Sequence, residues 1–193
     1  MWRELDPIFV EARRVWGGNG SGSLPKHTDI IRTELCNLLD EIDAASHIPT
    51  LLDVGCGKLE WMLPVIEKLA GYVGIDVVAE VIEHNRLAYP EQRFELLTDE
   101  PLPEAYVVFC RDVMQHLPSH MNLELLDKIR ATRASYLVAT THYSRNSELA
   151  EVGYYRPINL SMPPYRLGKP MTVLRDHGRT RMGVWKLHHQ ETI

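Results

Sequence analysis

The stretch Leu51-Leu52-Asp53-Val54-Gly55-Cys56-Gly57 decides how the rest of the chain is interpreted. A short apolar run ends in an acid and is followed by two glycines one residue apart, a pattern typical of a buried parallel strand that turns sharply into a helix. The bare backbone of such a turn lets a nucleotide-like cofactor approach closely. A helix is expected from about residue 59 to 69, kinked or restarted at Pro64, with its N-terminus directed at the same place.

The spacing after this turn separates two classes of cofactor. A dinucleotide fingerprint requires a third glycine three residues after Gly57, where this chain has the large and negatively charged Glu60. The pattern therefore disfavours a diphosphate. The next predicted strand, residues 72–75, ends in Asp76, placed to accept hydrogen bonds from two ribose hydroxyls. Proteins that bind either class of cofactor have an acid at this position.

Length and composition predict one soluble domain. The chain has 193 residues, of which 45% are hydrophobic and 24% charged, enough for a substantial core. No apolar run approaches the roughly 18 residues of a membrane span, and the N-terminus lacks the order of a signal peptide. We therefore expect a cytoplasmic protein without a membrane partner. Cys36, Cys56 and Cys110 lack metal-ligand spacing, which predicts reduced thiols and no metal site.

The charge distribution bears on the choice of partner. A formal net charge of −5 argues against a broad electrostatic grip on nucleic acid. Basic residues nevertheless gather in the last thirty positions: Arg166, Lys169, Arg175, Arg179, Arg181 and Lys186. They could be solvated side chains of a terminal hairpin, or they could serve an anionic acceptor. Both interpretations stay open.

Hydrophobic periodicity predicts alternating strands and helices after a separate N-terminal segment. Residues 1–15 place apolar side chains on one helical face, and the Gly/Ser-rich residues 16–25 are interpreted as a flap over the cofactor, although an expression linker has a similar composition. A core helix should begin near Thr28, a good N-cap. We divide the chain into an N-terminal helix and flap, 1–27, and a single domain, 28–193. Further strands are expected at 93–97, 106–110 and 135–140, and a terminal antiparallel hairpin at 171–175 and 182–187.

Three motifs in order resemble the cofactor motifs of class I S-adenosylmethionine-dependent methyltransferases: Asp53-Val54-Gly55-Cys56-Gly57, Gly74-Ile75-Asp76, and Asp99 after the third strand. The resemblance implies an α/β, Rossmann-like fold with a seven-stranded, mostly parallel sheet and a C-terminal antiparallel hairpin. It also implies that the glycine turn passes the methionine and ribose of the cofactor, that Asp76 holds the ribose hydroxyls and that Asp99 lies beside the adenine. A Rossmann-like domain with another ligand, or with none, is the alternative.

Two longer segments are similar to those of small methyltransferases that act on sugars and related metabolites. One is the Trp-Gly, Ser-Gly, Ser-Leu and Thr run over residues 16–28, and the other is Gly-Tyr-Tyr-Arg-Pro-Ile-Asn-Leu with a later Pro-Pro-Tyr, residues 153–165. The expected cofactor-binding residues are Trp16, Gly20, Ser21, Gly22, Ser23, Thr28, Asp53, Gly55, Cys56, Gly57, Trp61, Asp76, Val77, Asp99, Cys110 and Arg111. The expected acceptor-binding residues are Tyr143, Tyr155, Arg156, Asn159 and Tyr165.

Methyl transfer from a sulfonium is an in-line displacement that needs alignment and no covalent enzyme intermediate. A hydroxyl acceptor must also lose a proton, which calls for a base such as His or a carboxylate. Asp112 and His116 follow the fourth strand four residues apart and would share one face of a helical turn, while His142 follows the fifth. We predict these three as the catalytic candidates. In many methyltransferases a His in this segment only braces the loop, and that alternative stays open.

The sequence thus predicts an S-adenosylmethionine-dependent O-methyltransferase that acts on a hydroxyl of a sugar, glycan or similar small polar metabolite and releases S-adenosyl-L-homocysteine. An N-methyltransferase acting on a small molecule or peptide is the alternative enzyme. A catalytically silent cofactor-binding module of a larger polypeptide is the alternative outside enzymes. A nucleic-acid acceptor is disfavoured by the acidic balance and by the lack of an Asn/Asp-Pro-Pro-aromatic segment after strand four. A homo-oligomer is compatible with the sequence.

Overall fold

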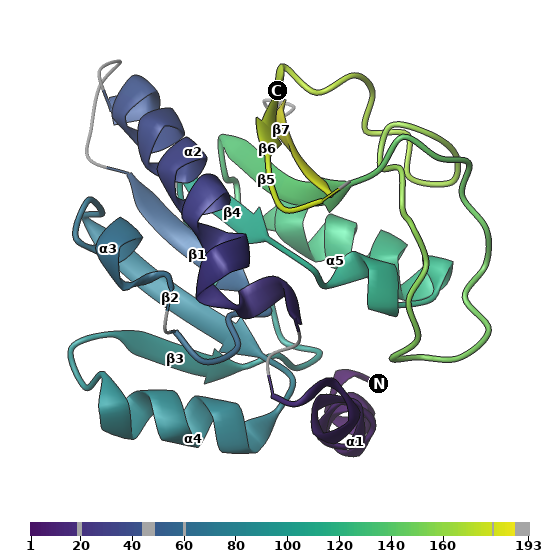
Figure 1. The fold of residues 1–193 in the computed structure, drawn as a ribbon, viewed down its shortest axis with the longest axis horizontal. Coiled ribbons are helices and arrows are strands. Elements are labelled where there is room, and N and C mark those ends of the chain that lie inside the picture. The colour runs from purple at the N-terminus through teal and green to yellow at the C-terminus, as the bar shows by residue number, and fades with distance from the viewer. Residues whose placement is uncertain (19–20, 44–48, 60, 179, 188–193) are drawn as a thin grey trace.

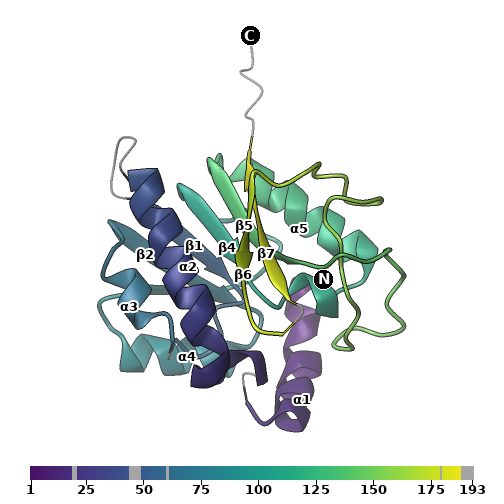
Figure 2. The ribbon, with the colours of Figure 1, turned by 45° about the horizontal axis from the view of Figure 1, so that its top comes forward.

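The computed structural model describes residues 1–18, 21–43, 49–59, 61–178 and 180–187. It consists of one sheet with helices on both faces (Figures 1 and 2). The strands are β1 (Thr50–Val54), β2 (Gly71–Asp76), β3 (Arg93–Leu96), β4 (Val107–Cys110), β5 (Tyr136–Thr141), β6 (Thr172–Arg175) and β7 (Arg181–Lys186). The α-helices are α1 (Asp6–Trp16), α2 (Pro25–Asp43), α3 (Leu63–Ile66), α4 (Ala79–Ala88) and α5 (Ser119–Ala131). Short 3-10 helices are η1 (Trp2–Leu5), η2 (Ser21–Ser23) and η3 (Met114–His116).

The seven strands lie in the order β3-β2-β1-β4-β5-β7-β6. The first five in this order pair in parallel, whereas β7 runs antiparallel to both β5 and β6. The predicted fold class is therefore confirmed, including the C-terminal hairpin. The strand order reverses between β1 and β4, so the carboxyl ends of these two strands form the switch point at which open α/β sheets bind ligands.

Two apolar clusters sandwich the sheet, because side chains alternate between its faces. Leu51 contributes to a cluster with α2 and α3, and Leu52 contributes to a cluster with α5 and η1. One face of α2, formed by Ile31, Leu35, Leu38 and Ile42, is buried in the first of these clusters. Both faces of the strands are thus covered, which explains why β1 reads as a continuous apolar run.

Two helix boundaries differ from the prediction. Helix α2 begins at Pro25, so Thr28 lies inside the first turn, fully buried, with its hydroxyl donating to the Leu24 carbonyl rather than capping the helix. Proline is favoured in the first turn because its missing N–H is not needed there. The helix expected over 59–69 is reduced to α3, which carries Pro64 in its first turn. In the part of the chain that the structure describes, no helix is both long and apolar enough to cross a membrane.

Candidate active site

A pocket opens at the carboxyl ends of β1, β2 and β4. It is bounded by the turn after β1, the turn after β2, the segment after β4 and the N-terminal segment. The residues that line it are Trp2, Leu5, Phe9, Arg13, Trp16, Ser23, Asp53, Val54, Gly55, Cys56, Gly57, Trp61, Asp76, Val77, Val78, Leu97, Phe109, Arg111, Asp112, Val113, His116 and Leu117. The predicted glycine turn and its two flanking acids therefore share one cavity.

The turn after β1 requires glycine for two reasons. Gly55 and Gly57 have positive φ angles, 82° and 52°, which side chains other than hydrogen disfavour. A Cβ atom on Gly55 would also overlap the Val113 side chain, which lines the pocket. The turn is tied to β2, because the Gly55 and Cys56 amides both donate to the Ile75 carbonyl, at 2.7 and 3.0 Å.

Asp76 at the end of β2 is held by the backbone around it. Its Oδ2 accepts from the Gly57 amide at 3.0 Å and its Oδ1 accepts from the Val78 amide at 2.9 Å. Burial raises the pKa of this carboxyl, and the two amide hydrogen bonds oppose that rise. A carboxylate accepts about four hydrogen bonds, so each oxygen retains capacity for a donor in the pocket.

Asp53 at the carboxyl half of β1 is buried next to Tyr72, whose hydroxyl donates to Asp53 Oδ2 at 2.8 Å. Burial raises the pKa of Asp53 to about 7, although the Tyr72 hydrogen bond lowers it. Near neutral pH this carboxyl is therefore poised between its neutral and charged forms. A positive charge bound in the pocket would favour the charged form.

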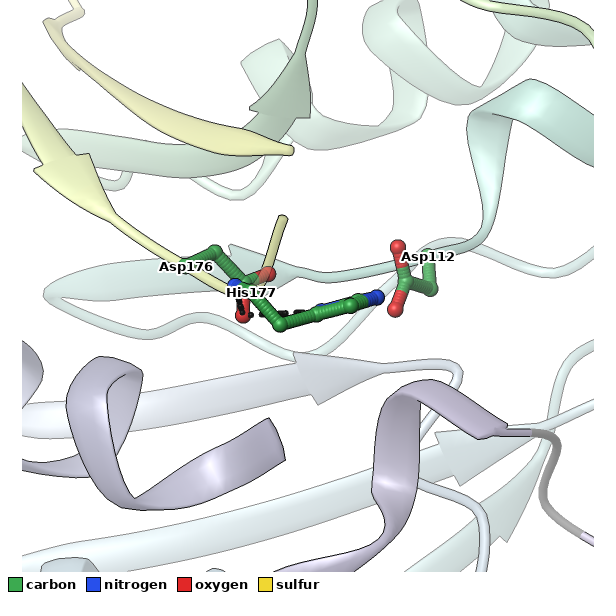
Figure 3. A group of neighbouring side chains, drawn as sticks. All are labelled: Asp112, Asp176 and His177. Carbon is green, nitrogen blue, oxygen red and sulfur yellow. Dashed lines mark hydrogen bonds and ion pairs between the residues drawn. The ribbon is translucent and has the colours of Figure 1, made fainter. Parts of the chain in front are cut away.

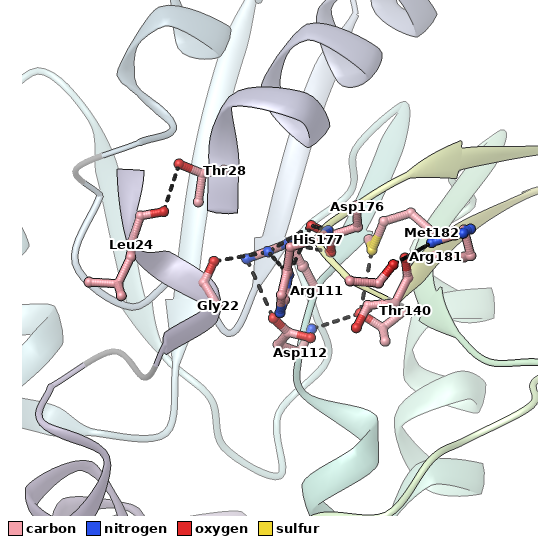
Figure 4. Close-up of polar contacts among 12 residues, drawn as sticks. Gly22, Leu24, Thr28, Arg111, Asp112, Thr140, Asp176, His177, Arg181 and Met182 are labelled. Carbon is pink, nitrogen blue, oxygen red and sulfur yellow. Dashed lines mark hydrogen bonds and ion pairs between the residues drawn. The ribbon is translucent and has the colours of Figure 1, made fainter. Parts of the chain in front are cut away.

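Arg111, directly after β4, is the centre of a polar network (Figure 4). Its Nε and Nη2 donate to both carboxylate oxygens of Asp176, each at 2.9 Å, and Nη2 also donates to the Gly22 carbonyl at 3.0 Å. The guanidinium carbon lies 5.4 Å from the centre of the Trp61 ring. Arg111 thus joins β4, the loop after β6 and the Gly/Ser-rich segment around one wall of the pocket.

Removal of Asp176 is expected to destabilise the fold strongly. Its side chain is fully buried against Arg111. Among the described residues, Asp176→Ala therefore leaves the buried guanidinium with Asp112, at 3.4 Å, as its one ion-pair partner. We expect the free energy of unfolding in urea to fall by about 3 kcal/mol. The control is Arg175→Ala, which removes an ion pair to Glu34 from an arginine that is 74% exposed. The control should cost less than about 1 kcal/mol; equal losses in the two variants would contradict this account.

Asp112, Asp176 and His177 lie close together beside this arginine (Figure 3), with one ligand atom from each within 4.8 Å of the others. Such a set could hold a metal ion. Arg111 already lies among them, however, since its guanidinium bonds to Asp176 and lies 3.2 Å from His177 Nδ1 and 3.4 Å from Asp112. A fixed cation thus supplies the positive charge that these carboxylates face, and we assign no metal here.

His116, the last residue of η3, faces the pocket with a defined tautomer. Its Nδ1 lies 3.0 Å from the Tyr154 carbonyl, which can only accept, so Nδ1 carries the proton and Nε2 carries the lone pair. The ring packs on Trp16 with the ring centres 4.8 Å apart. Burial lowers the pKa of His116 from its ordinary 6.5, which keeps the ring neutral at pH 7. A neutral imidazole with an available lone pair is suited to accept a proton.

Asp112 also lines the pocket, in an unusual conformation. Its φ is 58°, and it precedes η3 instead of sharing a helical turn with His116. Its amide donates to Thr140 Oγ1 at 2.9 Å, and its Oδ1 accepts from Gln115 Nε2 at 2.7 Å. A left-handed conformation is uncommon for a residue other than glycine and is often found at functional sites. The hydrogen-bonding partner that orients His116 is Tyr154, not Asp112.

The fold is similar to that of several solved structures. No family model matches the sequence, and no curated protein matches it. The structure is similar to magnesium protoporphyrin IX methyltransferase from Synechocystis PCC 6803 with bound S-adenosylhomocysteine, with a TM-score of 0.63 and 13% identity over 93% of this chain and 94% of that one. It is similar to mitomycin 7-O-methyltransferase, with a TM-score of 0.62 and 18% identity over 96% of this chain and 60% of that one.

A third similar structure is an RNA methyltransferase from Salinibacter ruber in complex with S-adenosyl-L-homocysteine, with a TM-score of 0.55 and 15% identity over 84% of this chain and 93% of that one. This chain has the class I methyltransferase fold. The acceptors named for these three proteins are a porphyrin, a natural product and RNA. The methyltransferase fold therefore does not by itself select an acceptor.

In this methyltransferase fold the predicted cofactor residues divide into two groups. Those that line the pocket are Trp16, Ser23, Asp53, Gly55, Cys56, Gly57, Trp61, Asp76, Val77 and Arg111. Gly22 contributes its carbonyl to Arg111, and Cys110 points into the core beside α5, where burial raises the pKa of its thiol. Gly20 lies outside the described residues, and the Ser21 side chain is likewise not described.

Asp99 and Thr28 do not reach the pocket. The Asp99 carboxylate is 61% exposed and lies 3.2 Å from the Met1 ammonium group. The wall that was expected to carry this acid is apolar instead, formed by Val77, Val78 and Leu97. Thr28 is buried inside α2 for the reason given above.

The predicted acceptor residues lie in the long connection between β5 and β6. Arg156 and Tyr165 are buried and bond to each other, with Arg156 Nη2 donating to Tyr165 Oη at 3.0 Å. Asn159 bonds to its own loop, to Ser144 and Asn146. Tyr143 and Tyr155 are exposed, and only Tyr155 lies near the pocket, with its ring centre 6.1 Å from that of His116. Arg156, Asn159 and Tyr165 therefore stabilise the loop and do not line the cavity.

His142 is likewise engaged away from the cavity. Its Nδ1 lies 3.1 Å from the Ile158 amide nitrogen and 3.2 Å from the Ile158 carbonyl oxygen, and its Nε2 lies 3.3 Å from the Tyr155 hydroxyl. The sequence interpretation missed the contribution of the N-terminal segment, since Trp2, Leu5, Phe9 and Arg13 all line the pocket. The apolar helical face predicted for residues 1–15 was the available signal, but it was not connected with the pocket.

Proposed function

We propose that this chain is an S-adenosylmethionine-dependent O-methyltransferase acting on a hydroxyl of a sugar, glycan or similar small polar metabolite. One observation carries the proposal. A single cavity combines the glycine turn and Asp76, which suit an adenosyl cofactor, with a neutral His116 whose Nε2 lone pair is available for a proton. The similar folds that contain S-adenosylhomocysteine support this choice of cofactor.

The residues present fit that cofactor. Asp76 has hydrogen-bonding capacity left for two ribose hydroxyls, and Val77, Val78, Leu97 and Trp2 offer an apolar wall for a flat ring system. Asp53 supplies a carboxyl whose charged form a cation would stabilise. When bound, S-adenosylmethionine would supply an electrophilic methyl carbon on a positively charged sulfur. Gly55 adds backbone without a side chain to the lining of the pocket.

His116 supplies the base that a hydroxyl acceptor needs. An acceptor hydroxyl that takes a methyl group from bound S-adenosylmethionine, with sulfur as the leaving group, would also have to lose its proton. The hydroxyl proton then goes to Nε2, since Nδ1 is already protonated and bonded to the Tyr154 carbonyl. Because burial keeps His116 neutral at pH 7, the lone pair is present before the acceptor binds.

The position of Tyr155 is a further argument for a ring-shaped acceptor that carries hydroxyl groups. Its side chain is 60% exposed, and its ring lies beside both His116 and His142, with centre distances of 6.1 and 6.2 Å. An exposed aromatic face with a hydroxyl offers both an apolar platform and a hydrogen bond. A sugar ring presents the matching combination of C–H faces and hydroxyl groups.

The direct test incubates the protein with methyl-labelled S-adenosylmethionine and a panel of free sugars, nucleotide sugars, glycosides and amines. We expect transfer to a hydroxyl of a sugar and loss of cofactor binding in Asp76→Ala. Transfer only to amines would replace the proposal with N-methylation. Binding of S-adenosylhomocysteine without transfer to any of these acceptors would favour a silent binding module, and absence of binding by calorimetry would remove the cofactor assignment altogether.

Cofactor affinity is expected to depend on pH through Asp53. Its pKa of about 7 in the free protein means that a cationic ligand must displace a proton when it binds below that pH. The dissociation constant of S-adenosylmethionine, whose sulfonium carries the positive charge, should therefore rise as pH falls from 8 to 6, by up to about tenfold per pH unit below 7. Calorimetry in buffers of different ionisation enthalpy measures how many protons are released when the ligand binds. Asp53→Asn is the control and should lose this dependence; a wild-type profile identical to that of Asp53→Asn would contradict it.

A further inference from the structure

Residues 153–156, Gly-Tyr-Tyr-Arg, lie alongside residues 115–117 although about forty positions separate them in the chain. The Gly153 amide donates to the His116 carbonyl at 2.9 Å, and the Arg156 amide donates to the Gln115 carbonyl at 3.1 Å. Arg156 Nη2 donates to the Leu117 carbonyl at 2.9 Å. We call residues 153–156 the clamp. Its donors form hydrogen bonds to three consecutive carbonyls, those of Gln115, His116 and Leu117.

The clamp also fixes the ring of this histidine. The Tyr154 carbonyl accepts from His116 Nδ1 at 3.0 Å, so the same segment holds both the backbone and the imidazole. Free imidazole side chains exchange a proton between the two ring nitrogens, and the hydrogen bond made by one nitrogen selects which of them is protonated. The lone pair therefore stays on Nε2 only while residues 153–156 remain in register with 115–117.

Burial of the Arg156 guanidinium beside residues 115–117 carries a free-energy cost. Arg156 is only 4% exposed, and besides Leu117 its guanidinium bonds only to the Tyr165 hydroxyl, at 3.0 Å. Its Nε and Nη1 have no hydrogen-bond partner among the described residues. Its charge acts on the exposed carboxylate of Glu148, whose pKa is lowered by hydrogen bonds from Ser119 and also by Arg156. A buried guanidinium with two unsatisfied nitrogens costs free energy, and a local violation of packing rules is characteristic of functional positions.

We propose that Arg156 is a positioning residue that locks the clamp against residues 115–117 and so keeps His116 in the tautomer whose Nε2 can accept the acceptor's proton. The inference rests on the proposed function for its catalytic consequence. The expected effect of Arg156 on the His116 tautomer does not depend on turnover. Arg156 reaches this position because the connection between β5 and β6 loops out beside α5 and returns to the end of η3 (Figure 1).

The test compares Arg156→Met with the wild type by nitrogen-15 NMR of the His116 ring. Methionine keeps an unbranched apolar stem and removes the buried charge, so we expect the variant to fold, with a melting temperature within about 4 °C of the wild type. We expect the wild-type ring to be a single Nδ1-protonated tautomer and the variant ring to be a mixture. The affinity for S-adenosylhomocysteine should stay within about twofold, while kcat falls by about 10- to 100-fold.

The matched control is Arg145→Met, which changes an exposed arginine of the same connection and should leave tautomer and kcat unchanged. If Arg156→Met fails to fold, Arg156→Lys keeps the charge without the forked geometry and should show the same tautomer mixture. A single Nδ1-protonated ring in the folded Arg156 variant, with unchanged kcat, overturns the inference and leaves the proposed function intact. A tautomer change without turnover by any form of the protein supports the inference and counts against the proposed function.

Discussion

Gly55→Ala is expected to abolish binding of S-adenosylhomocysteine. The φ of 82° at this position strains any residue with a Cβ, and the new Cβ would overlap Val113 on the pocket wall. Since both effects act at the turn itself, we expect the free energy of unfolding to fall by about 3 kcal/mol and the affinity to fall by more than about 100-fold. Urea unfolding and calorimetry measure the two quantities separately.

A matched control is Gly71→Ala at the start of β2. There an added Cβ would meet Thr50 Cγ2 at 3.6 Å, an ordinary contact, and the φ is not in the left-handed region. This variant should bind as the wild type does. In Gly55→Ala combined with Val113→Ala, the overlap is removed but the strain remains, so part of the affinity should return. Equal affinities of Gly55→Ala and Gly71→Ala would show that the ligand does not use this turn.

His116→Gln is expected to lower kcat by about 10²- to 10⁴-fold while the protein still binds S-adenosylhomocysteine. Glutamine retains a polar side chain of similar reach but cannot accept a proton at neutral pH. With cofactor saturating at every pH, the wild-type kcat should fall with acid only below pH 6.5, because burial lowers the pKa of His116 from that ordinary value and the ring must be neutral to act. The residual activity of His116→Gln should lack this acidic limb.

The control for this prediction is His142→Gln. Both ring nitrogens of His142 are engaged, with Ile158 and Tyr155, and the ring does not line the pocket. We expect a decrease in kcat below about tenfold, far from the 10²- to 10⁴-fold effect of losing a base. If His142→Gln lost the most activity and His116→Gln little, the base would belong to the end of β5. A pH profile unchanged in both variants would favour an acceptor that needs no base.

Local features of the sequence were sufficient for the sheet and for half of the site. The strands were predicted to within about one residue because buried parallel strands are short, apolar and bounded by turn residues. Gly55, Gly57, Asp53 and Asp76 could be assigned because backbone conformation and strand ends fix them within a few residues. The helix starts were less accurate, since Pro25 and Thr28 both suit a first turn.

Contacts between distant segments could not be predicted in the same way. Asp99 has the expected sequence position, yet the N-terminal segment brings Trp2 and Leu5 to that side of the pocket and leaves the carboxylate at the surface. Arg111 was assigned to the cofactor, and its partner Asp176 lies 65 residues away. Asp112 and His116 were paired on helical spacing, but the left-handed φ of Asp112 breaks the turn between them.

The sequence by itself determined the order of the strands and helices, the glycine turn and the acids at two strand ends. Those properties follow from side-chain periodicity and from backbone angles that only certain residues adopt. Only the tertiary structure decided that His116 has its lone pair on Nε2 and that two nitrogens of the buried Arg156 lack a hydrogen-bond partner among the described residues. The physical reason is that a tautomer and a desolvation cost depend on which atoms of remote segments lie within hydrogen-bonding distance, and no local pattern encodes that.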